Sequence, residues 1–305
     1  MKIEYNKLSH FFFYLTNISA YDIHRRDEYV KYWIKKTGSL TNIESKSLDK
    51  VKKIFLKYSQ YGSKKYIGRC FIDREENEIL TSIKSFVNKK EYTEIVRTLD
   101  IFSQRFETLW IEDEKRLRNI KKELERLSND QYFQDVCNKF SIVFGQIPNN
   151  YLIRLFVVPV ESQNIGGEAN TGFGIVSIEI RDTRDIKNGL FVSLHELAHM
   201  ILRKEKGIRF IGLNIKQKNA LLDIEIIKNM GVKDGLEEIL LRTLIPDGYL
   251  SYDSKDTLDK TPNLNPFEKR LNLEMYDIAK KYFETNQKID QDYLHIMIEK
   301  IIQIN

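Results

Sequence analysis

A histidine–glutamate–histidine cluster in the second half of the chain offers the residue types of a hydrolytic metal site. His195 and His199 are four residues apart, and a helix places residues at that spacing on one face, about one turn apart. Two imidazoles so arranged can occupy two corners of a tetrahedral zinc site. Glu196 is turned away from direct ligation, but its carboxylate can reach a water molecule on the metal. The cluster therefore predicts one Zn2+ ion held by the two histidines, with Glu196 as general base.

The surroundings of the motif support this prediction. The chain contains only five histidines, so a chance pairing of two of them around a glutamate is improbable. Residues 191–202 are otherwise almost wholly apolar, which predicts a helix buried in the core. Ionisable groups on such a helix are costly unless a metal ion or a polar partner compensates them. A metal site accounts for the motif better than polar residues that merely lie on a helix.

The third protein ligand separates the known subclasses of such sites. The metzincin pattern requires a glycine and a histidine where this chain has Leu202 and Glu205, so that pattern is excluded. A glutamate from a later helix remains, and residues 235–244 offer two adjacent ones, Glu237 and Glu238. On a helical wheel Glu237 lies in the middle of the apolar arc and Glu238 at its edge, so the wheel leaves both open.

Other residues are candidates for supporting roles. Glu225, on the preceding predicted helix with Asp223, is a more distant choice of ligand. A carboxylate that is not a ligand can orient a ligand histidine through its second ring nitrogen. Possible donors to a reaction oxyanion do not differ enough in sequence to be ranked, and none is assigned; they are Tyr249, Tyr252, Arg242 and His295.

Strands and helices are predicted in separate parts of the chain. Residues 151–160 are typical of a buried strand, and residues 174–181 alternate like a half-buried one, with a loop or hairpin at 161–171 between them. The remaining patterns predict helices: one from 47 that ends at Gly62, others at 75–89 and 92–127, the motif helix at 190–204 ended by Gly207, and a helical region from 217 interrupted at 246–266.

Strands confined to one middle segment, with helices before and after, predict an α+β fold. We expect a mostly helical N-terminal domain of unknown role over residues 1–145. Residues 146–305 are expected to form the catalytic core, with a small mixed sheet and the motif helix.

This order of elements resembles the gluzincin branch of zinc metallopeptidases: two strands, an H-E-x-x-H helix, then a glutamate on a downstream helix. Residues 238–243 also resemble the E-x-L-x-R-A segment of an uncharacterised bacterial gluzincin-like group. The resemblance covers about residues 150–250. It implies a zincin-like core with Glu238 as the third zinc ligand, and we favour Glu238 over Glu237 on that basis.

The predicted function is the hydrolysis of peptide bonds by a zinc-bound water that Glu196 activates, with a peptide or protein as substrate. The strand at 174–181 is the expected sheet edge on which an extended peptide would pair. A peptide deformylase would need a cysteine ligand, and Cys137 lies far upstream without a matching motif. The alternative from another class is a catalytically silent zincin scaffold that binds or regulates a partner.

Composition excludes some classes of protein. The net charge of +5, from 49 basic and 44 acidic residues, is too small to predict nucleic-acid binding. No segment reaches the roughly 18 consecutive apolar residues of a membrane span. Cys70 and Cys137 are isolated, which is typical of buried thiols. Without a secretory pattern at the N-terminus, a cytoplasmic location is expected.

Overall fold

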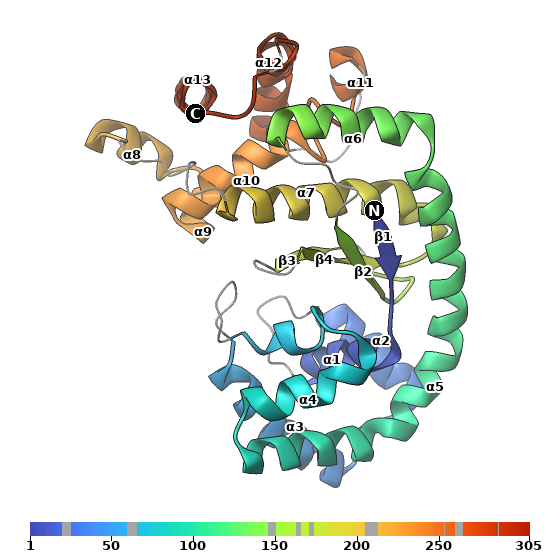
Figure 1. Cartoon of the computed structure of the whole chain (residues 1–305). Helices are drawn as coiled ribbons and strands as arrows, with labels where there is room; N and C mark the ends of the chain where they lie inside the picture. The colour runs from blue at the N-terminus through green and yellow to red at the C-terminus, as the bar shows by residue number, and fades with distance from the viewer. Residues whose placement is uncertain are drawn as a thin grey trace. The chain divides into compact units, whose positions relative to one another are not determined.

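The computed structural model describes residues 1–19, 26–59, 66–145, 151–162, 166–170, 174–204, 213–252, 254–259, 265–285 and 287–305 (Figure 1). The predicted helix ends at Gly62 and Gly207 lie outside these residues. The chain forms two compact units. One contains Lys2–Arg126 and Tyr151–Gly189, and the other contains Met1, Leu127–Asn150 and Leu190–Asn305. In this division residues 151–189 belong to the same unit as residues 2–126, whereas the predicted domains were 1–145 and 146–305.

The sheet has four strands in the order β1-β2-β4-β3. Strands β1 (Lys2–Glu4), β2 (Leu152–Val157) and β4 (Ile175–Ile180) are parallel, and β3 (Gly167–Asn170) is antiparallel to β4, so the sheet is mixed as predicted. The expectation that strands occur only in the middle segment is wrong, because β1 pairs with β2 from the N-terminus. A three-residue strand is too short to show a period in the sequence, and only its pairing reveals it.

The predicted sheet edge is also wrong. Strand β4 lies between β2 and β3, so its backbone groups pair on both sides and cannot receive an added strand. Its side chains are buried on both faces, including Ser177 at 5% exposure, whereas the alternating pattern had predicted one solvated face. Strands β1 and β3 form the two edges of the sheet.

Over the described residues, the helices of this unit include α1 (Lys7–Ile18), α2 (Asp27–Thr37), α3 (Asn42–Lys57), α4 (Glu76–Phe86), most of α5 (Lys89–Ser128) and two short 3-10 helices, η1 (Ile67–Cys70) and η3 (Thr183–Asp185). Helix α3 begins before the predicted residue 47, because Thr41 and Glu44 form a capping box at its start. The long helix α5 agrees with the predicted 92–127. Stacked and tilted aromatic rings from α1, α2, α5 and β2 fill the core, among them Phe13, Tyr14, Trp33, Phe106 and Phe156.

The other unit is helical over the residues that the structure describes. Its helices are α6 (Gln131–Phe144), most of α7 (Ile186–Lys204), α8 (Ile215–Leu221), α9 (Glu225–Met230), α10 (Val232–Leu244), α11 (Lys255–Asp259), α12 (Pro266–Phe283) and α13 (Gln291–Ile304). Helix α10 packs against α9 and α12, and α12 packs against α11 and α13. The described helices include none with the length and apolar character of a membrane span.

Helix α7, which carries the motif, starts earlier than predicted. It begins at Ile186, directly after the 3-10 helix η3 (Thr183–Asp185), so Gly189 lies inside the helix instead of before it. A Cβ atom at Gly189 would approach the Ile180 side chain to 2.6 Å. The glycine therefore permits a close contact between the first turn of α7 and the end of β4.

Candidate metal centre

Helix α7 holds the motif in a buried and therefore rigid setting. His195 and His199 are 8% and 6% exposed. The apolar residues of the helix are buried almost all round it: Leu190, Phe191, Leu194, Leu197, Ala198, Met200, Ile201 and Leu202. Glu196 and Val192, one turn apart, are only half-buried, so the carboxylate of Glu196 lies on the more accessible side of the helix.

Helix α10 supplies the acidic side of the centre. It follows Gly231, whose φ of 82° lies in the region that favours glycine. A Cβ atom at Gly235 would lie 2.8 Å from the backbone of Ile227, so this glycine allows α9 and α10 to pack closely. Glu237 and Glu238 follow one helical turn into α10. Glu237 is buried, and Glu238 is half-buried.

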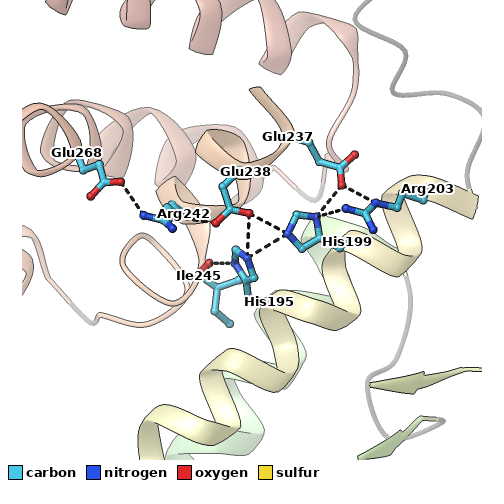
Figure 2. A network of polar contacts seen from close by, with 8 residues as sticks. All are labelled: His195, His199, Arg203, Glu237, Glu238, Arg242, Ile245 and Glu268. Carbon is cyan, nitrogen blue, oxygen red and sulfur yellow. Dashed lines mark hydrogen bonds and ion pairs between the residues drawn. The ribbon is translucent and has the colours of Figure 1, made fainter. Parts of the chain in front are cut away.

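Three ligand atoms converge between α7 and α10 (Figure 2). The Nε2 atoms of His195 and His199 are 3.1 Å apart. Glu238 Oε2 lies 3.1 Å from Nε2 of His199 and 3.5 Å from Nε2 of His195. Ligand atoms at tetrahedral angles, with bonds of roughly 2.0–2.1 Å to a metal, are separated by about 3.3 Å. The triangle therefore has the size of one face of a tetrahedral zinc site.

The hydrogen bonds on the far side of each ring show which nitrogen carries the proton. His195 Nδ1 lies 2.8 Å from the carbonyl oxygen of Ile245, and His199 Nδ1 lies 2.6 Å from Glu237 Oε1. Because a carbonyl and a carboxylate can only accept, both Nδ1 atoms must donate. Each neutral imidazole then presents a lone pair at Nε2. When both rings are neutral, two lone pairs and a carboxylate oxygen thus face one another, an arrangement that a metal ion or a proton between them would stabilise.

The electrostatic environment favours positive charge at the same point. Burial by itself lowers the pKa of His199, but hydrogen bonds to Glu237 and Glu238 outweigh it and raise the pKa to about 9. Burial by itself raises the pKa of Glu238, whereas its contacts with His195 and His199 hold the pKa far below its ordinary value. The raised pKa of His199 and the lowered pKa of Glu238 have the same cause, which is the attraction between the carboxylates and positive charge on the imidazoles.

Two arginines bind the outer sides of the two glutamates. Arg242 Nε donates to Glu238 Oε1 at 2.8 Å, and its Nη1 donates to Glu268 Oε1 at 2.7 Å. Arg203 Nε donates to Glu237 Oε1 at 2.9 Å. With one oxygen of Glu238 engaged by Arg242, the other is left to face the imidazoles. The carboxylate is therefore oriented from behind, as metal ligands commonly are.

The structure brings together three of the predicted site residues, His195, His199 and Glu238. Of the two adjacent glutamates, Glu238 lies near the Nε2 atoms of both histidines, and Glu237 contacts the outer nitrogen of His199. The remaining candidate ligand, Glu225, is exposed at the start of α9 and belongs to no part of this cluster. Its neighbour Asp223 is exposed and lies 3.6 Å from Lys228.

The residues considered as donors to a reaction oxyanion lie in different environments. Tyr249 is buried against the rings of Tyr276 and Phe283, and His295 is exposed on α13. Of these candidates, Arg242 is the one whose side chain contacts a residue of the cluster. The two cysteines are buried free thiols, as expected.

Sequence reasoning missed three groups at the centre: Arg203, Glu268 and the carbonyl of Ile245. Arg203 had a usable signal, since it lies four residues after His199 on the same helix, just as Arg242 lies four residues after Glu238. The carbonyl of Ile245, the residue that follows α10, is a backbone group, and every residue has one, so the sequence gives no signal for it.

No protein-family model matches this chain, and neither a curated protein nor a solved structure was found to match it. The resemblance to gluzincins therefore stays a prediction.

Proposed function

We propose that this protein is a zinc-dependent metallopeptidase with a zincin-like core, in which His195, His199 and Glu238 hold one zinc ion and Glu196 is the general base. The observation that carries the proposal is the convergence of three electron-pair donors, two Nε2 atoms and one carboxylate oxygen, at the spacing of a tetrahedral zinc site. Three protein ligands leave a fourth position for water, which is the pattern of catalytic rather than structural zinc sites.

The donor set fits zinc in its chemistry as well as in its spacing. Imidazole nitrogen and carboxylate oxygen are both common zinc ligands, and the hydrogen bonds to Ile245 and Glu237 hold a proton on each Nδ1, so the neutral form of each ring has its lone pair on Nε2. When bound, a zinc ion lowers the pKa of water to about 7 and polarises a carbonyl oxygen. This is the chemistry that amide hydrolysis requires.

We assign the proton transfer of this reaction to Glu196. It follows His195 on α7 and lies on the less buried side of the helix, where solvent and substrate can reach it. Among the described residues it has no hydrogen-bond or ion-pair partner, so its carboxylate is free to accept a proton from water. It would then deliver that proton to the amine that leaves. A silent scaffold would need the three ligands but not this carboxylate.

The decisive experiment compares the wild type with Glu196→Gln. Each protein is dialysed against zinc, its metal content is measured, and cleavage of a peptide library is followed by mass spectrometry. We expect one zinc ion per chain in both proteins. Cleavage should fall by about 100- to 10,000-fold in Glu196→Gln, because a general base contributes a factor of that order.

Glu299→Gln on α13 is a matched control, because its carboxylate is remote from the motif in sequence and has no part in the cluster. It should cleave like the wild type. Zinc in every protein with cleavage in none would overturn the peptidase and favour a zinc-binding scaffold. A wild-type protein that holds no zinc would overturn the metal centre itself.

A further inference from the structure

Glu237 is not one of the three candidate ligands, yet its side chain contacts one of them, His199. Its side chain is buried at 8% exposure, although a buried carboxylate is costly unless it is paired. One oxygen, Oε1, accepts from two donors, His199 Nδ1 at 2.6 Å and Arg203 Nε at 2.9 Å (Figure 2). Glu237 therefore stands behind His199 on the side opposite to the three converging ligand atoms.

We propose that Glu237 is a positioning residue of the zinc centre, which holds the His199 proton on Nδ1 and turns Nε2 toward His195 and Glu238. The proposal rests on the proposed function, since it assumes that these three residues bind zinc. A carboxylate that accepts from the outer nitrogen of a ligand histidine fixes the orientation and tautomer of the ring and makes it a stronger electron-pair donor.

The two ligand histidines are supported in different ways. His195 donates to the backbone carbonyl of Ile245, which is neutral and which no side-chain substitution can remove. His199 donates to a charged side chain, which a substitution can remove. The strength of zinc binding through His199 thus depends on one replaceable residue, whereas binding through His195 depends on the backbone.

Arg203 completes this support from the same helix as His199. It lies four residues further along α7, so the arginine and the histidine reach Glu237 from one face of the helix. The Arg203 side chain is 31% exposed, against 10% for Glu237. Solvent screens its charge, so Arg203 should matter less than Glu237.

The test measures zinc affinity by competition with a chelator of known affinity, independently of any cleavage. Glu237→Gln should bind zinc about 10-fold more weakly than the wild type, and Glu237→Ala up to about 100-fold more weakly, because outer partners of ligand histidines contribute factors of this size. The matched control is Glu274→Gln on α12, whose carboxylate pairs with Arg270 and Lys300 away from the centre. The control should bind zinc like the wild type.

Two further measurements separate positioning from a general structural role. Thermal unfolding of the zinc-free proteins shows whether Glu237→Gln still folds, and affinities are compared only between folded proteins. Two-bond 1H–15N NMR correlations of the imidazoles show which ring nitrogen carries the proton. In the zinc-loaded wild type the His199 proton should be on Nδ1, and Glu237→Ala should lose the sharp signal of that proton as it exchanges with water.

Wild-type zinc affinity in a folded Glu237→Ala protein, or a His199 proton that stays equally protected in it, would overturn the positioning role. Both results leave the zinc centre and the peptidase intact, since those are tested in the wild type. Arg203→Gln adds a graded check. It should weaken zinc binding by less than Glu237→Gln does, and the exposed Arg270→Gln should not change it. A larger effect of Arg203→Gln than of Glu237→Ala would also contradict the proposal.

Discussion

Each compact unit contains buried histidine, but the histidines have different partners. His10, on α1 beside the sheet, is 4% exposed, nearly the same as His199 on α7. Its Nδ1 donates to the carbonyl oxygen of Asn6 at 3.0 Å, and its Nε2 accepts from the backbone N–H of Val157 at 3.1 Å. Both nitrogens are thus satisfied by the backbone, and His10 needs no ion.

His195 and His199 also donate from Nδ1, but their Nε2 atoms face only acceptors, each other and Glu238 Oε2. The two regions therefore differ in what meets the second nitrogen, and not in burial or in having an Nδ1 that donates a hydrogen bond. A buried histidine whose second nitrogen meets an N–H group is part of the core. One whose second nitrogen meets another imidazole and a carboxylate is a candidate metal ligand.

The largest expected effect is the loss of zinc from the α7 centre. His199→Ala removes one of the three proposed protein ligands, so zinc affinity should fall by more than the roughly 100-fold upper range for an outer partner. His10→Gln should leave zinc affinity unchanged, because neither nitrogen of His10 is available. Chelator competition checks both. Equal losses in the two variants would remove the distinction drawn between these histidines.

A smaller effect concerns pH and the stability of the region around His10. Burial lowers the pKa of His10 to about 4 from its ordinary 6.5, so the folded protein keeps this ring neutral. Below pH 6.5 the unfolded chain takes up a proton that the folded chain does not. The contribution of His10 to the free energy of unfolding should therefore be complete above pH 6.5 and decrease toward pH 4, by about 3 kcal/mol in total.

Urea unfolding of the wild type and His10→Gln measures this contribution, with a zinc chelator present throughout so that the metal centre is in one state. The wild type should lose more stability than the variant as the pH decreases from 6.5. Parallel pH profiles would show that His10 is protonated in the folded protein, and that its hydrogen bonds have been assigned wrongly.

The smallest of these effects is expected at Arg242, which donates to the outer oxygen of the proposed ligand Glu238. Arg242→Gln should weaken zinc binding by roughly 10-fold, the lower end of the range for outer partners, because the arginine side chain is 39% exposed. Arg242→Lys should restore part of the affinity through its charge. If Arg242→Gln binds zinc as tightly as the wild type, the packing of α10 alone positions Glu238.

Helices and strands whose sequences carry a repeating pattern were predicted well. The apolar residues at helical spacing placed α5 and α7 within a few residues of their observed bounds, and the β-branched run placed β2. The start of α3 was missed, although Thr41 and Glu44 carry a capping signal, because the prediction followed the apolar period instead of the cap. The three residues of β1 carry no period at all.

The sequence by itself determined that two imidazoles and a carboxylate lie on one buried helix, because spacing along a helix is a local property of the chain. It also narrowed the candidates for a third ligand to two neighbouring glutamates, with Glu225 as a more distant choice. Only the tertiary structure decided that Glu238 faces both imidazoles while Glu237 faces the outer nitrogen of His199, and that the Ile245 carbonyl supports His195. Those choices depend on how α10 packs across α7, between residues 38 to 50 positions apart, and no local pattern encodes that contact.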